Sequence, residues 1–302
     1  MNKDILTLME LSKQDFDKLF NRAIHLKAAM KQADIHKPLM GKTLGLIFDK
    51  PSTRTRISFE TAMIHLGGSS IFINARDTQI VRDEPVRDTA RVLSRYIDGL
   101  VIRTYSQDFL NEFARYSTIP VINALTDLYH PTQVLCDIMT IIEYKGRYEN
   151  LKIVWVGDGN NVAHSWIQAA AILGLNLILA CPEGYEPDED VLKKALELKN
   201  GNITVTSDPF FAVKDADVIY TDVWASMGQE NEHNKRKRIF KQFQVNESLV
   251  NLAKPDAIVM HCLPAHRGEE ISEEVLEGPA SVVWDQSENK LHMNKAILEM
   301  LL

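Results

Sequence analysis

The arrangement of apolar residues constrains this sequence most: short runs rich in branched residues alternate with longer segments of helical period. The alternation occurs in both halves and is typical of β-α-β units, in which parallel strands form a sheet that helices cover. The runs that we expect to be strands are 43–48, 70–74, 99–103, 121–124, 152–156, 177–180, 203–206, 218–221, 258–261 and 282–284. The sequence therefore predicts an α/β fold of two doubly wound parallel-sheet domains with helices on both faces of each sheet.

A polar break predicts where one domain ends and the next begins. The helical segment 131–144 is followed by Lys145-Gly146-Arg147, and glycine-containing polar stretches commonly separate compact units. A chain of 302 residues also suits two domains at roughly 150 residues each. We expect a first domain over residues 1–146 and a second over 147–302, with the final helix, 288–302, returning to the first domain.

Composition and charge exclude several classes of protein. Hydrophobic residues make up 45% and charged residues 25% of the chain, which is typical of globular proteins and unlike disordered or fibrous chains. The net charge of −7 argues against a surface that wraps nucleic acid. The longest apolar region, 166–181, is interrupted by polar residues, whereas a membrane helix needs about 20 predominantly apolar ones.

Cysteine usage and the N-terminus indicate the compartment. Cys136, Cys181 and Cys262 are widely spaced and form no CxxC pair, so neither a disulfide framework nor a structural zinc site is expected. The first ten residues have no basic start followed by an apolar core, so they do not resemble a signal peptide. We expect a cytoplasmic protein with no nucleic-acid or membrane partner.

A basic run, Lys235-Arg236-Lys237-Arg238, lies in the most polar stretch of the chain, 229–242. Such a run can bind nucleic acid, but this one is short, isolated and bordered by Glu230 and Glu232. We therefore expect a solvated, mobile loop, and loops of this kind can close over an active site to exclude water.

The segment Phe48-Asp49-Lys50-Pro51-Ser52-Thr53-Arg54-Thr55-Arg56 predicts an anion site. It stands between a strand and a helix that continues through Leu66. Free backbone N–H groups at a helix start bind anions, and hydroxyls and arginine add donors for phosphate oxygens. The alternative is that the segment only caps the helix. No GxxxxGK[ST] loop is present, so a nucleoside triphosphate is not indicated.

Arg54 and Arg56 have different expected tasks. Residues two apart on a helix point to nearly opposite sides, so both cannot face one ligand. Arg56 can form an ion pair with Glu60 at i+4, which leaves Arg54 for the ligand.

Further donors follow other strands of the first half. Arg103 ends one strand, and His130-Pro131-Thr132-Gln133 opens the long helix. Ligands of open α/β sheets bind at the carboxyl ends of strands. His130 could otherwise be a helix cap or a satisfied interior residue, but beside a phosphate site binding is the favoured interpretation.

In the second half, Gly157-Asp158-Gly159-Asn160-Asn161-Val162 lies between a strand and a helix and partly resembles a dinucleotide-binding turn. Val162 replaces the third glycine of that motif, and only Glu183 lies near the place of the acid that would contact ribose. A nicotinamide dehydrogenase remains an alternative. The neighbouring asparagines suit recognition of a small polar group such as a carboxylate.

Two more polar loops follow strands of the second half, 221–230 and 261–267. In the first, Asp222 can hold an ammonium. In the second, Cys262 can be a nucleophile, a noncovalent polar contact or a buried inert thiol. No HExxH or paired-carboxylate motif indicates a metal hydrolase or a glycosidase.

Together these residues resemble a known family, the ornithine carbamoyltransferases of the aspartate and ornithine carbamoyltransferase superfamily. The resemblance covers essentially the whole chain and rests on PSTRTR, HPTQ, DVWASMGQE and HCLP. The first motif is shared across the superfamily. The other three are similar to the ornithine enzymes rather than to the aspartate, putrescine or acetylornithine enzymes.

The resemblance implies transfer of a carbamoyl group from carbamoyl phosphate to the side-chain amine of L-ornithine, without a cofactor, a metal or a covalent intermediate. It also implies a mobile loop with the SMG motif and assembly as a homotrimer. The implied contacts to carbamoyl phosphate are Ser52, Thr53, Arg54, Thr55, Gln79, Arg103, His130, Gln133, Cys262, Leu263 and Lys290, and those to ornithine are Asn161, Asp222, Ser226 and Met227. Among them, Arg103, His130 and Cys262 are the expected catalytic residues.

One position departs from the family pattern. The family usually has ENR where this chain has Glu288-Asn289-Lys290. Lys290 can still place a positive charge near the carbamoyl oxygen, but an ammonium cannot act as a planar two-pronged donor.

Two alternative functions remain open. A nicotinamide dehydrogenase that uses the Gly157 turn predicts NAD binding. A catalytically silent sensor that uses the same two clefts predicts carbamoyl-phosphate binding without formation of citrulline.

Overall fold

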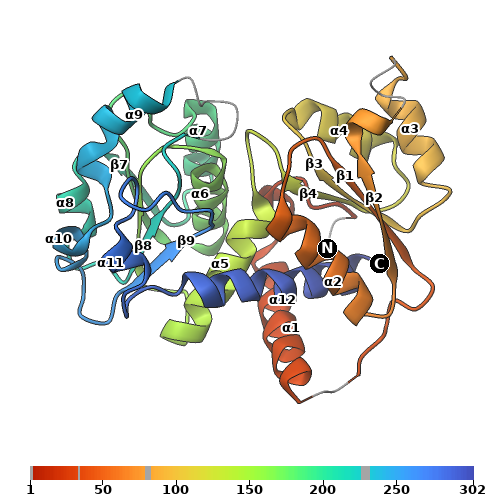
Figure 1. The fold of residues 1–302 in the computed structure, drawn as a ribbon, viewed down its shortest axis with the longest axis horizontal. Helices are drawn as coiled ribbons and strands as arrows, with labels where there is room; N and C mark the ends of the chain where they lie inside the picture. The colour runs from red at the N-terminus through yellow and green to blue at the C-terminus, as the bar shows by residue number, and fades with distance from the viewer. Residues whose placement is uncertain (1–2, 33–34, 79–82, 226–231) are drawn as a thin grey trace. The chain divides into compact units, whose positions relative to one another are not determined.

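A computed structural model describes residues 3–32, 35–78, 83–225 and 232–302 (Figure 1). The chain forms two compact units. The first consists of Met1–Met139 and Glu288–Leu302, and the second of Thr140–Ser287. The division therefore falls inside the helix that precedes the polar break at Gly146, and the end of the chain belongs to the first unit.

The first unit contains one sheet of four parallel strands in the order β2-β1-β3-β4. The strands are β1 (Thr43–Phe48), β2 (Ser69–Asn74), β3 (Gly99–Arg103) and β4 (Val121–Leu125). The helical segments of this part of the chain are η1 (Leu8–Glu10), α1 (Lys13–Lys31), α2 (Thr53–His65), η2 (Ala75–Asp77), α3 (Val86–Leu93), α4 (Gln107–Tyr116) and α5 (Pro131–Lys145).

The second unit contains a sheet of five parallel strands in the order β7-β6-β5-β8-β9. The strands are β5 (Lys152–Val156), β6 (Asn176–Ala180), β7 (Asn202–Thr206), β8 (Val218–Thr221) and β9 (Ile258–His261). The helical segments here are α6 (Asn161–Leu173), α7 (Glu189–Glu197), α8 (Pro209–Val213), α9 (His233–Ile239), η5 (Phe240–Phe243), α10 (Glu247–Val250), α11 (Glu273–Leu276) and α12 (Val283–Leu301), which continues into the first unit.

The predicted α/β class with two parallel sheets is confirmed. The inner strands of each sheet are apolar on both faces, as expected where helices cover both faces, whereas the edge strands β2 and β7 are partly exposed. All five residues of β3 are buried, and Leu100 and Ile102 pack with Leu110 and Phe113 of α4. Among the described residues, the helices are all too short or too polar to cross a membrane.

The expected strand at 282–284 is wrong. Ser281 forms an isolated bridge with Val259 of β9, and the N–H of Val282 donates to the Val259 carbonyl at 3.0 Å. Val283 then begins α12 and is fully buried. Val282 and Val283 are therefore buried where the helix begins, whereas Trp284 is 55% exposed. Periodicity cannot separate so short an apolar run at a helix start from a short buried strand.

The expectation of a loop over 229–242 is also wrong for the residues that the structure describes there. Residues 233–243 form α9 and η5. Arg236 is only 6% exposed, and Phe240 is fully buried. Lys235, Lys237 and Arg238 are exposed. The basic run therefore forms one turn of a helix, with its second residue directed into the protein.

Candidate active site

The carboxyl ends of three neighbouring strands bring the predicted phosphate residues to one edge of the first sheet. In the register of β1 and β3, Phe48 lies beside Arg103, and the N–H of Asp49 donates to the Arg103 carbonyl at 2.8 Å. β4, next to β3, leads into the segment that holds His130 and Gln133. This is the edge at which open parallel sheets bind ligands.

The start of α2 is built as a donor-rich turn. Ser52 is the N-cap, and its hydroxyl accepts the N–H of Thr55 at 3.3 Å. Thr55 is buried, and Arg54 is exposed. Within the described part of the chain, Arg54 forms no hydrogen bond or ion pair, so its guanidinium is available to a ligand.

Arg56 has a structural contact, as the sequence predicts. Its Nε lies 2.9 Å from Glu60 Oε1, and its guanidinium lies 3.6 Å from the centre of the Phe72 ring on β2. Both partners belong to the first unit, so this side chain holds α2 against the edge strand.

A cavity of about 460 Å³ adjoins this turn. Its lining includes Ser52, Thr53 and Arg56, but not Arg54. Two other lining residues were not predicted from the sequence: Asn74 at the end of β2 and Arg76 in the turn that follows. Like Arg103, they lie at or just beyond the carboxyl end of a parallel strand, where open sheets of this kind bind ligands. The full lining is Phe48, Asp49, Lys50, Pro51, Ser52, Thr53, Arg56, Ile57, Phe72, Asn74 and Arg76.

Lys50 is a third residue at this edge whose role was not predicted from the sequence. Its side chain is buried, its ammonium donates to the carboxylate of Asp127, and it lies 4.0 Å from the centre of the Tyr105 ring. Lys50 therefore joins the loops that follow β1, β3 and β4.

Gln133 and Lys290 form a buried pair. Lys290 Nζ donates to Gln133 Oε1 at 2.8 Å, and Gln133 Nε2 donates to Asp137 Oδ1 at 2.8 Å. The neighbouring Asn289 accepts a hydrogen bond of 2.7 Å from Lys27 of α1, which fixes this part of α12. The ammonium of Lys290 is thus placed where its charge acts on the first-unit site.

His130 is buried and neutral. Burial is the main reason that its pKa lies well below the ordinary value, and the positive charges of Lys290 and Arg103 lower the pKa further. A neutral imidazole can still donate one hydrogen bond at neutral pH. The net positive charge of this site therefore comes from Arg103 and Lys290.

In the second unit, the turn after β5 is fixed by Asn160. Its side-chain oxygen accepts the N–H groups of Val162 and Ala163 at 2.9 and 3.2 Å, and its Nδ2 donates to Asp222 Oδ2 at 2.8 Å. The predicted ligand, Asn161, is the first residue of α6 and is half-buried. A Cβ at Gly159 would lie 2.2 Å from the Pro187 nitrogen, which explains this glycine by packing rather than by a dinucleotide.

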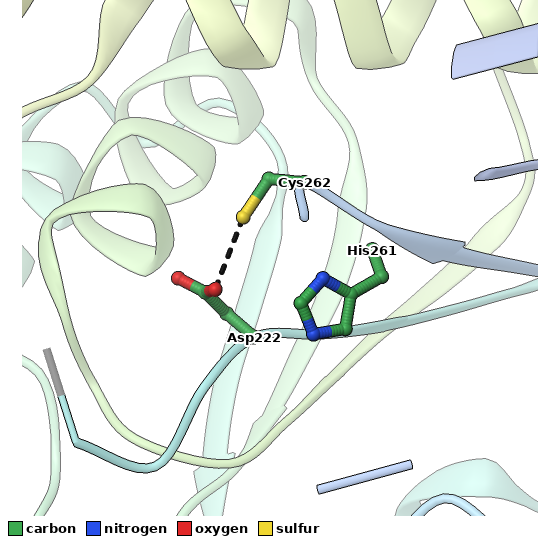
Figure 2. Close-up of side chains that lie close together, drawn as sticks. All are labelled: Asp222, His261 and Cys262. Atoms are coloured by element: carbon green, nitrogen blue, oxygen red, sulfur yellow. Dashed lines mark hydrogen bonds between the residues drawn. The ribbon is translucent and has the colours of Figure 1, made fainter. Parts of the chain in front are cut away.

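Asp222, His261 and Cys262 lie together at the ends of β8 and β9, as Figure 2 shows. The Cys262 thiol donates to Asp222 Oδ1 at 3.0 Å, and the Val223 N–H donates to the same oxygen at 2.8 Å. Asp222 is buried. No cation pairs with it among the described residues, so the carboxylate is oriented by neutral donors and is available to a cationic ligand.

Asp158 and Arg236 form a buried ion pair beside this cluster, with Arg236 Nη1 3.1 Å from Asp158 Oδ2. Burial raises the pKa of Asp158 to about 6, although Arg236 acts in the opposite direction. Asp158 is therefore mostly ionised at pH 7, and the pair anchors α9 to the turn after β5.

Three predicted ligands, Gln79, Ser226 and Met227, lie outside the described residues. The others divide between the units: Ser52, Thr53, Arg54, Thr55, Arg103, His130, Gln133 and Lys290 lie in the first, and Asn161, Asp222, Cys262 and Leu263 lie in the second.

Comparison with known protein families matches each half of the chain to one domain of a single family. Residues 3–143 match the carbamoyl-P binding domain of aspartate/ornithine carbamoyltransferase, and residues 149–301 match its Asp/Orn binding domain. The chain belongs to the aspartate/ornithine carbamoyltransferase family.

Individual relatives point to one branch of that family. The ornithine carbamoyltransferases of Syntrophus aciditrophicus and Geobacter metallireducens are 57% and 55% identical to this chain over 302 residues, which is 100% of each sequence. The solved structure of ornithine carbamoyltransferase from Pyrococcus furiosus superimposes with a TM-score of 0.94 at 53% identity and covers 98% of this chain and 95% of that one.

Proposed function

We propose that this protein is an ornithine carbamoyltransferase, which transfers the carbamoyl group of carbamoyl phosphate to the side-chain amine of L-ornithine and releases L-citrulline and phosphate. The observation that carries the proposal is the full-length identity to ornithine carbamoyltransferases. The motif residues that the structure describes follow the carboxyl ends of strands in each unit, where parallel sheets bind their ligands.

In the proposed mechanism, the first unit binds and polarises carbamoyl phosphate. Ser52, Thr53, Arg54 and Thr55 bind the phosphate at the start of α2. Arg103, the neutral His130 and Lys290 stabilise the negative charge that develops on the carbamoyl oxygen, with Gln133 orienting the carbamoyl group. The catalytic contribution is electrostatic preorganisation, because these groups are already fixed before the substrate arrives.

The second unit is proposed to bind ornithine. Asp222 and Asn161, with Ser226 and Met227, recognise the amino-acid end, and Cys262 and Leu263 face the reacting amine. The buried, cation-free carboxylate of Asp222 supports this assignment, since it can pair with an ammonium. The amine that attacks must be deprotonated, and a noncovalent contact is the role proposed for the Cys262 thiol.

We also propose that residues 1–146 form the carbamoyl-phosphate domain and residues 147–302 the ornithine domain, with the final helix, 288–302, returning to the first domain. The protein is proposed to act in the cytoplasm as a homotrimer or a higher assembly of trimers. Exposed apolar side chains of the first unit, Ile57 and Ile64 on α2 and Ile71 on β2, can form contacts between copies. Arginine biosynthesis is the proposed context, since the P. furiosus relative is named as the anabolic enzyme. Light scattering that gave a monomer mass would contradict the trimer.

The function is tested by colorimetric detection of citrulline after the purified protein is mixed with carbamoyl phosphate and ornithine. We expect citrulline and phosphate in equal amounts, with little product when putrescine or aspartate replaces ornithine. Carbamoyl-phosphate binding without citrulline would indicate a sensor, and binding of NAD would indicate a dehydrogenase.

A further inference from the structure

A tight turn beyond β9 gathers three metal-ligating side chains. The N–H of Glu269 donates to the His266 carbonyl at 2.9 Å, and Gly268 has a φ of 83° with no atom near a potential Cβ. The backbone conformation alone therefore calls for glycine there. One ligand atom from each of His266, Glu269 and Glu270 lies within 4.8 Å of the other two.

Glu270 presents one carboxylate oxygen to this cluster. The residue is 0% exposed. Its Oε1 accepts the N–H of His266 at 2.5 Å and lies 3.1 Å from His261 Nε2. Because His261 Nδ1 accepts the Leu263 N–H at 2.8 Å, the ring proton is on Nε2 and donates to Glu270. The orientation of the carboxylate is thus fixed by two donors.

The other oxygen of Glu270, Oε2, is buried and accepts no hydrogen bond from any residue that the structure describes. It lies 4.0 Å from His266 Nδ1. Buried polar atoms are nearly always satisfied, so an oxygen of this kind indicates a bound water or ion. The other two members of this cluster offer an exposed imidazole and a second carboxylate, which together favour a cation.

We propose that His266, Glu269 and Glu270 bind one divalent transition-metal ion of the Zn²⁺ type, with Glu270 coordinating through Oε2. Imidazole and carboxylate ligands suit such ions. Bonds of about 2.0–2.2 Å require the three ligand atoms to approach to roughly 3.4 Å in a tetrahedral site. Small rotations of His266, which is exposed, and Glu269 achieve this, and water completes the coordination.

The position of Lys237 indicates that a positive charge is favourable beside Glu269. Its ammonium lies 3.3 Å from Glu269 Oε1, and its own side chain is exposed on α9. The position next to Glu269 is therefore one that a cation occupies, and an incoming metal ion can displace this flexible side chain at little cost. The hydrogen bonds from His261 and His266 to Oε1 serve as the outer contacts that orient a metal-bound carboxylate.

The test must separate this site from the cluster in Figure 2, because Asp222, His261 and Cys262 also have ligand atoms within 4.8 Å of one another. A Cys262→Ser variant removes the thiolate that would dominate binding there. Zn²⁺ alone is titrated calorimetrically into the untagged full-length variant. We expect one ion per chain, and Co²⁺ as a spectroscopic probe should give no sulfur charge-transfer band.

In this background, His266→Ala and Glu269→Gln should each weaken Zn²⁺ binding at least about tenfold. His25→Ala, which removes an exposed histidine on α1, is the matched control and should leave the affinity unchanged. Zn²⁺ should raise the Tm of the Cys262→Ser protein, because the ion binds only the folded state, and the rise should be much smaller once His266 is removed. Absence of Zn²⁺ binding to Cys262→Ser, or equal affinity after His266→Ala, would overturn the proposal.

Discussion

At the scale of single residues, Arg54 and Arg56 occupy neighbouring positions but have different surroundings. Arg54 is exposed and unpaired within the described residues, whereas Arg56 contacts Glu60 and Phe72. Arg54→Ala should weaken carbamoyl-phosphate binding by about 1.5–3 kcal/mol, since it removes a charge-assisted contact. Calorimetry with carbamoyl phosphate or inorganic phosphate measures the change.

The control for Arg54 is Arg56→Ala, which should lower the free energy of unfolding more than it lowers ligand affinity. The cavity beside α2 is lined by Arg56 and not by Arg54, so the two variants also test which arginine binds the phosphate. If Arg56→Ala abolished phosphate binding and Arg54→Ala did not, Arg56 would be the phosphate ligand.

Lys290 replaces the arginine expected from the family pattern, and its ammonium is held by Gln133. Lys290→Ala should lower kcat, because it removes a positive charge from the buried site at which the carbamoyl oxygen gains negative charge. Lys290→Arg should keep or improve kcat. Steady-state kinetics with saturating substrates decides, and a fully active alanine variant would show that this charge takes no part in catalysis.

Asp222 gives a prediction about substrate choice. Asp222→Asn keeps the shape of the side chain but removes the charge that pairs with the ornithine ammonium, so ornithine binding should weaken by about 2–5 kcal/mol if the pair is desolvated. Carbamoyl-phosphate affinity should change little, because its proposed phosphate ligands lie in the other unit. Initial rates with ornithine, putrescine and aspartate measure the effect. A wild-type preference for putrescine or aspartate would refute the substrate assignment.

At the scale of elements, the strands were predictable and some helices were not. Runs such as 99–103 and 152–156 match β3 and β5 residue for residue, because branched residues buried on both faces leave a continuous apolar signal. The start of α12 carries the same signal although it is helical. α9 was missed because Arg236 is the only buried residue among those of α9 whose burial the structure describes, and an arginine in a sequence does not predict a buried position.

Arg236 provides the test of how α9 is held. It pairs with Asp158, donates to the Trp224 carbonyl at 2.7 Å and lies 4.8 Å from the centre of the Tyr185 ring. Arg236→Ala leaves the buried Asp158 unpaired, so the free energy of unfolding at pH 7 should fall by about 3–5 kcal/mol. Lys235→Ala, an exposed position in the same basic run, should change it by less than about 0.5 kcal/mol. Urea unfolding of both variants measures the difference, and equal effects would mean that α9 is not anchored by this pair.

At the scale of the whole molecule, sequence motifs located the residues at strand ends but not the partners that orient them. Ser52 and Asp222 could be singled out from their position after a strand. Lys50 and Asn160 also follow strands, but their roles could not be predicted, because these depend on Asp127 and Asp222, which lie 77 and 62 residues away in sequence. Such contacts follow from the order of strands in the sheet, and the sequence specifies that order only through the complete fold.

The pH dependence of unfolding is a property of the whole molecule, and His130 predicts its sign. Burial, Lys290 and Arg103 hold the pKa of His130 well below its ordinary value in the folded protein, whereas in the unfolded chain it is about 6.5. Below pH about 6.5 the unfolded chain therefore binds a proton that the folded protein does not. The free energy of unfolding falls with acidification, by up to about 1.4 kcal/mol per pH unit from this group, and the stabilisation is complete only above the unfolded pKa.

The variant His130→Gln tests this, because glutamine does not titrate. Between about pH 7.5 and about pH 5.5, a range that brackets the unfolded pKa, the free energy of unfolding of the variant should fall less than that of the wild type. Urea unfolding at both pH values measures the difference. Parallel slopes for the wild type and His130→Gln would contradict a lowered pKa of His130 in the folded protein.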